Sequence, residues 1–459
     1  MTAAIGLDRV RAALPAEHYL DVTSEDRGYP GYAIANVGLP AVAVRPQTAE
    51  EVALVLDAAR ADGAAVVPMG AHTAMTLGRP LSRYDVALDM LGLDRIIEYE
   101  PADLTVTVEA GVRLSDLQIR LHEHGQYLPI DPFPGDEVTI GGLLATARSG
   151  AWRGHLPAAR DLILGLTVAQ VDGTLATSGG RVVKNVTGYD LHRLHTGALG
   201  ALGVIVSASF KVSPLPEATA TLAVRCANLA SAEQLAFDVW DRRLPLRALT
   251  ILDARTAVQL GLPASPVVLI EVADVASAVA RAEREIEAVP KSAGGLGRAE
   301  LLDLADSAQA SGQHVYTFDG SDGTNAAASK FLRDMVWRRL RSHTDRDDWA
   351  TYALLRLGVP PSEVRGTLEA VGAHGLEGWA HLAAGSVLAV GERTTAATIE
   401  ALRAHASNVG GFLQVEHPTT AIDGTIDPFG AGDIELTRAL KAKFDPTGVL
   451  NPGRWAEGV

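Results

Sequence analysis

The sequence predicts an α+β fold in two lobes, and three observations support this prediction. Short runs of β-forming residues alternate with helical segments along most of the 459 residues. Pro214 and Pro216 interrupt this alternation, and the segments that follow them differ in texture. A chain of this length has room for roughly two to three domains of about 150 residues each. We therefore expect a domain boundary close to these prolines.

The composition limits the function classes that remain. Hydrophobic residues make up 47% of the chain, enough for a sizeable core, but aromatic residues make up only 5%, so that core is mostly aliphatic. The formal charge of −15 argues against a nucleic-acid partner, because phosphate binding requires clustered Lys and Arg. An anionic substrate stays compatible with this charge, because a site can be locally positive in an acidic protein.

The chain has one cysteine, Cys226, so it has no internal disulfide. Iron–sulfur and cysteine-based zinc sites held by this chain alone are not expected, and we predict no metal site. The N-terminus lacks a basic start followed by an apolar core, and no uninterrupted apolar run of about 18 residues occurs. We expect a cytoplasmic protein with no membrane span.

The elements of the first lobe follow from capping residues and apolar runs. A helix is predicted over 48–62, with Thr48 as its N-cap, Glu51 completing a capping box and Gly63 after its end. A second helix is predicted from Ser115, as its N-cap, to Gly125. The predicted strands are 41–44, 64–67, 86–90, 96–99, 104–108, 162–171, 175–177 and 204–212.

The second lobe repeats strand and helix, which predicts a ferredoxin-like α+β cap. Its predicted strands are 221–226, 267–272, 352–357 and 387–390. Its predicted helices are 276–288, 326–341, 361–371 and 394–406, and a last helix at 434–444 belongs to the tail.

A glycine-rich segment at 179–206 is the most informative part of the chain. Glycine lets a backbone approach a ligand closely or adopt a positive φ, so this segment is typical of backbone wrapped around a large flat ligand. Lys184 and Asn185 are polar groups inside a run that is otherwise typical of buried backbone, so they need partners. Structural hydrogen bonds and direct ligand contacts are both open for them.

Three further segments have the composition of ligand-binding turns. The turn at 68–75 follows a strand and offers backbone N–H groups to an anion such as a pyrophosphate, or is an ordinary strand-to-helix turn. The segment 132–146 carries Gly141 and Gly142 together with hydroxyls of Thr139 and Thr146. The tail at 444–454 is rich in turn residues. None of these segments contains GxGxxG, so a Rossmann site is not indicated.

These four segments, in this order, resemble the vanillyl-alcohol-oxidase-type (PCMH-type) FAD-binding oxidoreductases, and the chain looks most like the GlcE-type FAD subunit of bacterial glycolate oxidase. The resemblance implies a two-lobed PCMH-type FAD-binding domain at 1–215, completed by 425–459, with the cap at 216–424 and FAD between them. It implies FAD contacts from Met69, Gly70, Ala71, His72, Thr73, Pro134, Gly135, Thr139, Gly141, Gly142, Thr146, Lys184, Asn185, Gly203, Val204, Ile205 and Asn451.

The chain departs from the resembled pattern in the first loop. Met69 stands where a basic residue is usual, and His72 where a glycine is usual. Some relatives attach FAD covalently through a histidine of this loop, one position away from His72 in an ungapped alignment. Covalent attachment at His72 therefore stands as an alternative to a phosphate contact or to exposure.

The catalytic candidates come from the cap. His417 is the best candidate base, since histidine titrates near neutral pH, and the preceding Glu416 is placed to orient it. This pair resembles the Glu-His pair of flavin-dependent D-2-hydroxy-acid dehydrogenases. Arg356 is the candidate carboxylate-binding residue. Those dehydrogenases also carry a metal-type His-x6-His pattern, of which His381 remains here while Leu388 fills the second place.

The resemblance leads to two functional hypotheses. In the first, the chain is an FAD-dependent oxidoreductase that oxidises a small 2-hydroxy acid such as glycolate or D-lactate and passes electrons to a partner. In the second, it is a non-catalytic FAD-bearing or scaffolding subunit of such a complex. A stand-alone flavin alcohol oxidase is a third possibility. The resemblance also implies a sister FAD subunit, an iron–sulfur electron-acceptor subunit, and peripheral association with the inner membrane through partners.

Overall fold

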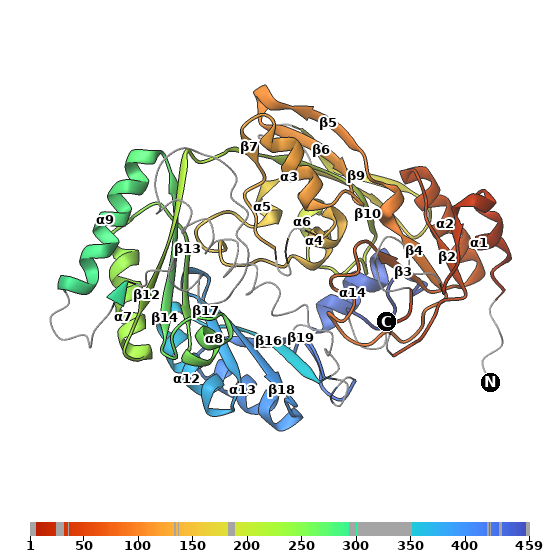
Figure 1. Cartoon of the computed structure of the whole chain (residues 1–459). Coiled ribbons are helices and arrows are strands. Elements are labelled where there is room, and N and C mark those ends of the chain that lie inside the picture. The colour runs from red at the N-terminus through yellow and green to blue at the C-terminus, as the bar shows by residue number, and fades with distance from the viewer. Residues whose placement is uncertain are drawn as a thin grey trace. The chain divides into compact units, whose positions relative to one another are not determined.

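The computed structural model describes residues 6–23, 32–34, 36–132, 135, 137–181, 189–292, 300–301, 351–419, 422, 424–430 and 434–455. The chain divides into two compact units (Figure 1). The first unit comprises Met1–Arg148, Pro157–Leu215 and Ala431–Val459, and the second comprises Ser149–Leu156 and Pro216–Gly430. The predicted helix at 326–341 lies outside the described residues.

The first unit begins with a small mixed sheet. Strands β2 (Val42–Val44), β4 (Val86–Asp89) and β3 (Val66–Met69) are parallel, and β1 (Tyr19–Leu20) pairs antiparallel with β2. Helix α2 (Ala49–Asp62) makes the crossover that parallel strands require, and it packs against α1 (Asp8–Ala12).

Helix α2 is delimited by the residues predicted to cap it. The side chain of Thr48 accepts a hydrogen bond from the backbone N–H of Glu51 at 3.2 Å, and Gly63 adopts a left-handed φ of 68° after the last turn. The Glu51 carboxylate accepts from the N–H of Gln47, one residue before the predicted partner. Both helix ends are thus satisfied by local residues.

A five-stranded antiparallel sheet forms the larger layer of the first unit. Its order is β5-β6-β10-β8-β9, and α4 (Ile140–Thr146) packs on β10. Helix α3 (Leu114–His122) starts one residue before Ser115, so the predicted Ser115 cap is wrong. Arg113 is its N-cap and makes no side-chain capping bond. The five strands are β5 (Ile96–Glu100), β6 (Thr105–Glu109), β8 (Ile163–Ala169), β9 (Leu175–Gly179) and β10 (Val204–Lys211).

Short elements complete the first unit. These are strands β7 (Gln126–Tyr127) and β11 (Ser213–Pro214), and helices α5 (Ala159–Leu162), α6 (Leu191–His195) and α14 (Ile434–Phe444). The tail after α14 returns to β3, where the N–H of Val66 donates to the carbonyl of Val449 at 2.8 Å and the N–H of Asn451 donates to the carbonyl of Val66 at 3.0 Å.

The second unit is built on one eight-stranded sheet with the order β15-β12-β14-β13-β17-β18-β16-β19. Every recorded strand pair in it is antiparallel. Its strands are β12 (Ala218–Arg225), β13 (Leu246–Leu252), β14 (Val267–Asp274), β15 (Glu300–Leu301), β16 (Tyr352–Gly358), β17 (Glu377–His381), β18 (Ser386–Glu392) and β19 (Phe412–His417).

The strand order shows two ferredoxin-like units joined edge to edge. The chain order β16, α12, β17, β18, α13, β19 and the spatial order β17-β18-β16-β19 are those of a βαββαβ unit. The earlier segment repeats this arrangement with β12, α7, β13, β14, α9 and β15. The helices are α7 (Leu229–Asp241), α8 (Ala254–Gln259), α9 (Ala276–Ser292), α12 (Val364–Ala373) and α13 (Ala396–Asn408).

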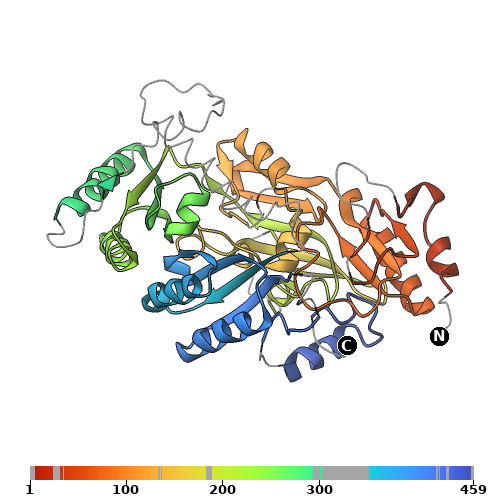
Figure 2. The same ribbon diagram turned by 60° about the horizontal axis from the view of Figure 1, so that its bottom comes forward.

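The two faces of this sheet differ in chemistry. Helices α7, α9, α12 and α13 cover one face (Figure 1), and a turned view shows the same layering (Figure 2). Residues such as Ile251, Ile270 and Leu355 pack beneath them in an aliphatic core. Successive strand residues point to opposite faces, so Thr250, Glu271 and Arg356 belong to the other face. We call this second face the polar face of the sheet.

Among the residues described above, every helix is too short or too polar to cross a bilayer.

Candidate functional site

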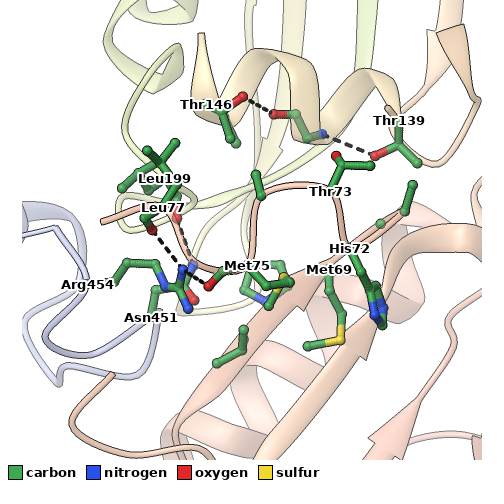
Figure 3. Close-up of a pocket in the computed structure, with 17 residues that line it drawn as sticks. Met69, His72, Thr73, Met75, Leu77, Thr139, Thr146, Leu199, Asn451 and Arg454 are labelled. Atoms are coloured by element: carbon green, nitrogen blue, oxygen red, sulfur yellow. Dashed lines mark hydrogen bonds between the residues drawn. The ribbon is translucent and has the colours of Figure 1, made fainter. Parts of the chain in front are cut away.

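A cavity lies in the first unit where the predicted loops meet (Figure 3). The β3 end and the turn after it form one wall, the start and end of α4 a second, and the C-terminal tail a third. The lining residues include Met69, Gly70, Ala71, His72, Thr73, Met75, Leu77, Thr139, Gly142, Thr146, Leu199, Asn451 and Arg454. Segments more than 300 residues apart in sequence thus share one site.

Close packing between two of these walls requires a glycine. A Cβ built on Gly70 would lie 2.2 Å from the Oγ1 of Thr139, which is far inside contact distance. Thr139 is the N-cap of α4 and accepts from the N–H of Gly142 at 3.3 Å. Gly70 therefore lets the turn after β3 lie directly against the α4 N-terminus, whose partial positive charge favours an anion.

The tail supplies a buried acceptor to the cavity. Asn451 is 4% exposed and adopts a left-handed φ of 44°, which Asn tolerates better than most residues. Its Nδ2 donates to the carbonyl of Leu199 at 2.8 Å, which fixes the amide. Its Oδ1 is buried without a hydrogen-bond partner in the described part of the chain, so it is available to a ligand N–H or O–H.

Arg454 is a cavity residue that sequence reasoning did not select. Its Nη1 donates to the carbonyls of Met75 and Leu77 at 2.7 and 2.8 Å, so it holds the turn after β3 in place (Figure 3). The signal was present, because Arg454 follows Asn451 by three residues in a segment already selected. Only the fold shows that this arginine reaches a turn 377 residues earlier in the chain.

The two unusual residues of the first turn also line the cavity. Met69 is 4% exposed at the end of β3, and its Sδ lies 3.9 Å from the hydroxyl of Tyr84. His72 adopts a left-handed φ of 57°, and its ring centre lies 6.0 Å from that of Tyr32. The lining thus contains a thioether where the resembled family has a basic residue.

Other predicted cofactor residues lie elsewhere. Gly203, Val204 and Ile205 are at the start of β10 and do not line the cavity, and Gly203 packs against Val168 and His195. Gly141 packs against Ala110 under α4. Gly135 has a φ of 128° and is also absent from the lining. Pro134, Lys184 and Asn185 lie outside the described residues.

The cavity residues fit part of FAD. Backbone N–H groups of a tight turn and the start of α4 suit a diphosphate, and the free Oδ1 of Asn451 suits a donor such as a ribose hydroxyl. The apolar lining from Met69, Met75 and Leu199 suits the flat part of a nucleotide.

A second polar cluster occupies the polar face of the eight-stranded sheet, inside the second unit. The Nε of Arg356 on β16 donates to the Glu416 carboxylate on β19, and its Nη1 donates to the Oγ of Ser386 on β18 at 3.0 Å. The two charged side chains are 14% and 2% exposed. The Nη2 of Arg356 is buried and has no hydrogen-bond partner within the described residues. This guanidinium can therefore bind an anionic group.

A β-bulge places His417 on the same face. Leu354 pairs with His417 whereas the next residue, Leu355, pairs with Val415, so Glu416 is the extra residue of β19. Without the bulge, successive residues would point to opposite faces. With it, Arg356, Glu416 and His417 gather on the polar face. The Glu416 carboxylate binds Arg356.

His381 lies on β17 beside this cluster. It is 5% exposed, and its Nδ1 lies 2.9 Å from the Oγ1 of Thr250 on β13. Burial lowers the pKa of His381 to about 3, and the positive charge of Arg356 adds to this effect. Leu388, in the place of a second histidine, is 1% exposed and pairs with Arg356 across β16 and β18. The described residues contain no group of three metal-ligating side chains.

Comparison with known families identifies two domains. A family profile described as FAD binding domain matches residues 40–179, and a profile described as FAD linked oxidases, C-terminal domain, matches residues 369–455. The first match contains the turn after β3 and α4. The second contains β17 to β19 and the tail that supplies Asn451.

Curated proteins match most of the chain. Glycolate oxidase subunit GlcD of Bacillus subtilis is 27% identical over 91% of this chain and 89% of its own length. D-lactate dehydrogenase of Archaeoglobus fulgidus is 26% identical over 90% of each chain. Glycolate oxidase subunit GlcE of Escherichia coli is 36% identical over 35% of this chain and 46% of its own length.

Solved structures show the same fold. p-Cresol methylhydroxylase with substrate bound aligns with a TM-score of 0.70 over 98% of this chain and 96% of its own, at 14% identity. 4-Ethylphenol oxidase from Gulosibacter chungangensis aligns equally well, at 15% identity. The predicted PCMH-type α+β fold and the predicted FAD cofactor are therefore confirmed.

Proposed function

We propose that this chain is an FAD-linked oxidase of the vanillyl-alcohol-oxidase type and that it oxidises a small 2-hydroxy acid such as glycolate or D-lactate. FAD, when bound, accepts a hydride from the carbon that bears the hydroxyl. The protein must bind the nucleotide, hold the substrate carboxylate and receive the hydroxyl proton. The first task belongs to the cavity of the first unit, and the other two to the polar face of the second.

The observation that carries this proposal is the free guanidinium edge of Arg356. Glu416 and Ser386 fix its Nε and Nη1, and its buried Nη2 has no protein partner among the described residues. An arginine held in this way is a preorganised carboxylate-binding group. His417, on the same face, is the proposed acceptor of the hydroxyl proton.

We propose that FAD is held by those predicted residues that line the three cavity walls. Gly70, Ala71 and Thr73 would hold the diphosphate from the turn after β3, and Thr139 and Gly142 from the start of α4. The buried Oδ1 of Asn451 would accept a hydrogen bond from the nucleotide. Covalent attachment through His72 is kept as a variant of this proposal, because His72 lines the same cavity.

Anaerobic mixing of the purified, FAD-loaded chain with glycolate or D-lactate tests the function. Loss of the flavin absorbance is the expected result, and unchanged absorbance with both acids would contradict it. An absorbance spectrum before and after acid precipitation separates free from covalent flavin. Release of all flavin into the supernatant excludes attachment at His72.

A second candidate is an FAD-bearing subunit whose chemistry takes place on a sister chain. The buried Leu388, in the place of a second histidine beside Arg356, favours it. Flavin that stays oxidised with either acid in the lone chain, and is reduced only after a sister subunit is added, would support this candidate. Oxygen consumption by the lone chain would instead indicate a stand-alone oxidase.

The relatives include two named subunits of glycolate oxidase, which suggests that this chain works in a multi-subunit complex. We propose a sister FAD subunit and an iron–sulfur subunit that accepts the electrons, with the complex in the cytoplasm or at the inner membrane through its partners. Co-expression of the neighbouring chains followed by size-exclusion chromatography tests this. A monomeric elution volume in their presence would contradict it.

A further inference from the structure

A strap formed by Ser149–Leu156 belongs to the second unit, although the residues on both sides of it belong to the first. It begins three residues after Thr146, which lines the proposed cofactor cavity. The chain therefore runs in six residues from Thr146 of the proposed cofactor loop to Trp152, which contacts the sheet that carries Arg356. Sequence reasoning assigned no chemistry to its side chains.

Trp152 anchors the strap to strands β13 and β14. Its Nε1 donates to the Oε2 of Glu271 at 2.8 Å, and the guanidinium of Arg247 lies 3.5 Å from the centre of its ring. Glu271 is fully buried and lies 3.9 Å from the Nε of Arg247. A hydrogen bond to a buried carboxylate and a cation–π contact fix this end of the strap.

Gly154 places the next residues against the turn between β17 and β18. A Cβ at this position would lie 2.7 Å from the carbonyl carbon of Ala383 and 2.8 Å from the nitrogen of Ala384, so only glycine fits. Ser386, three residues after Ala383, is the residue that accepts the Nη1 hydrogen bond of Arg356. The strap thus meets the sheet at the turn that leads into β18, the strand that begins with Ser386.

His155 follows Gly154, and one nitrogen of its ring has an unsatisfied hydrogen-bonding capacity. Its Nε2 is buried and has no hydrogen-bond partner in the described ranges. Burial also lowers the pKa of His155, so its ring is neutral at pH 7 and has one donor and one acceptor nitrogen. Buried polar atoms in native proteins nearly always have a partner, in the protein or in ordered water, so this ring nitrogen is available to a ligand.

We propose that His155 contacts the substrate: its Nε2 forms a hydrogen bond to an oxygen of the 2-hydroxy acid whose carboxylate Arg356 binds. This inference rests on the proposed function. It adds a substrate contact from the strap to those from the sheet, and it makes the strap part of the substrate site. Trp152 and Gly154 are then positioning residues, because they act by holding His155.

The test compares His155→Phe, which removes the hydrogen bond, with His155→Asn, which keeps a hydrogen-bonding side chain. His374→Asn is the matched control, because His374 is an exposed histidine of the same unit. Each FAD-loaded variant is titrated with oxalate, an unreactive dicarboxylate, by calorimetry, and its flavin reduction by glycolate and D-lactate is followed. FAD content and thermal unfolding are measured in parallel.

We expect His155→Phe to raise the oxalate Kd and the KM about 10-fold, as for one lost hydrogen bond, with a smaller change in kcat. His155→Asn should recover part of this loss, and His374→Asn should match the wild type. If the oxalate Kd and the KM of His155→Phe equal those of the wild-type protein, the inference is overturned. The proposed function still stands in that case, provided that the hydroxy acids reduce the flavin of the wild-type protein.

Two further outcomes are decisive. Misfolding or FAD loss in both His155 variants would overturn the inference, because it would give the ring a structural role. A wild-type protein that binds FAD but neither oxalate nor reducing 2-hydroxy acids would overturn the proposed function itself, and the substrate contact with it.

Discussion

Lys441 shows how a single buried charge can hold the tail of a protein. It is 2% exposed, and its Nζ donates to the Asp445 carboxylate at 2.6 Å and to the carbonyls of Ala201 and Leu450 at 2.9 and 2.6 Å. Burial lowers the pKa of Lys441, and the facing Asp445 opposes this shift. Three acceptors compensate the cost of burying an ammonium group.

Replacing Lys441 with Met is expected to destabilise the first unit by about 3–5 kcal/mol, because the Asp445 carboxylate would stay buried without its partner. Urea unfolding measures this loss. Lys443→Met, on the exposed side of the same helix, is the control and should change stability by less than about 0.5 kcal/mol. Equal effects of the two substitutions would contradict the assigned role.

Arg356 is the residue on which the proposed chemistry depends most. Arg356→Lys keeps the positive charge beside Glu416 but loses the planar fork, so the fold should persist while substrate binding weakens. We expect kcat/KM for the hydroxy acid to fall about 100-fold, from the loss of a charge-assisted hydrogen bond. Arg365→Lys, in a partly exposed ion pair with Glu233, is the control and should leave kcat/KM unchanged. An unaltered kcat/KM in Arg356→Lys would remove this residue from the substrate site.

At the scale of elements, the close contact between the turn after β3 and helix α4 requires that Gly70 has no side chain. Gly70→Ala would force its Cβ to within 2.2 Å of the Thr139 Oγ1, and both residues line the cavity. We expect FAD affinity to weaken by about 5- to 150-fold, because opening this contact costs on the order of 1–3 kcal/mol. Titration of the apoprotein with FAD, followed by flavin fluorescence, measures the change.

Gly366→Ala is the matched control for this substitution. Gly366 lies in α12, and a Cβ there meets no atom within 4 Å. Helical Gly→Ala changes without strain are neutral or slightly stabilising. FAD affinity that is unchanged in Gly70→Ala would show that the turn does not contact the nucleotide.

The edge strand β19 contains a β-bulge that its own sequence does not predict. The pair Glu416-His417 was selected from a resemblance, but its strand and its bulge were not predicted. A bulge is defined by a second strand, here β16, which lies about 60 residues earlier and pairs with both Val415 and His417. No local pattern in β19 contains that information.

At the scale of the whole molecule, buried neutral histidines make stability depend on pH in both units. Burial lowers the pKa of His195 in the first unit to about 4 and that of His381 in the second to about 3, against 6.5 for an unperturbed histidine. Between these values the unfolded chain binds a proton that the folded chain does not. The free energy of unfolding therefore rises with pH through this range. The contribution of each buried histidine to stability is lost progressively as the pH falls from about 6.5 towards the folded-state pKa.

Lowering the pH from 7 to 5 should thus reduce the stability of the first unit by about 2 kcal/mol through His195. It should reduce that of the second unit by about the same amount through His381. Calorimetric unfolding at both pH values measures the effect. His195→Gln should flatten the pH dependence of the first unit and leave that of the second unchanged. A stability that rises on acidification to pH 5 would contradict the assignment.

The sequence by itself determined the local signals: the caps Thr48 and Gly63 of helix α2, the βα alternation, and the order of the glycine-rich turns that carry the resemblance to FAD-binding enzymes. These follow from interactions between residues a few positions apart. Only the tertiary structure decided that Arg454 holds the turn after β3, that Glu416 binds Arg356, and that the strap carrying His155 belongs with the second unit. Each of these contacts joins residues at least 60 positions apart or depends on strand pairing, and such contacts form only once the sheets have fixed their registers.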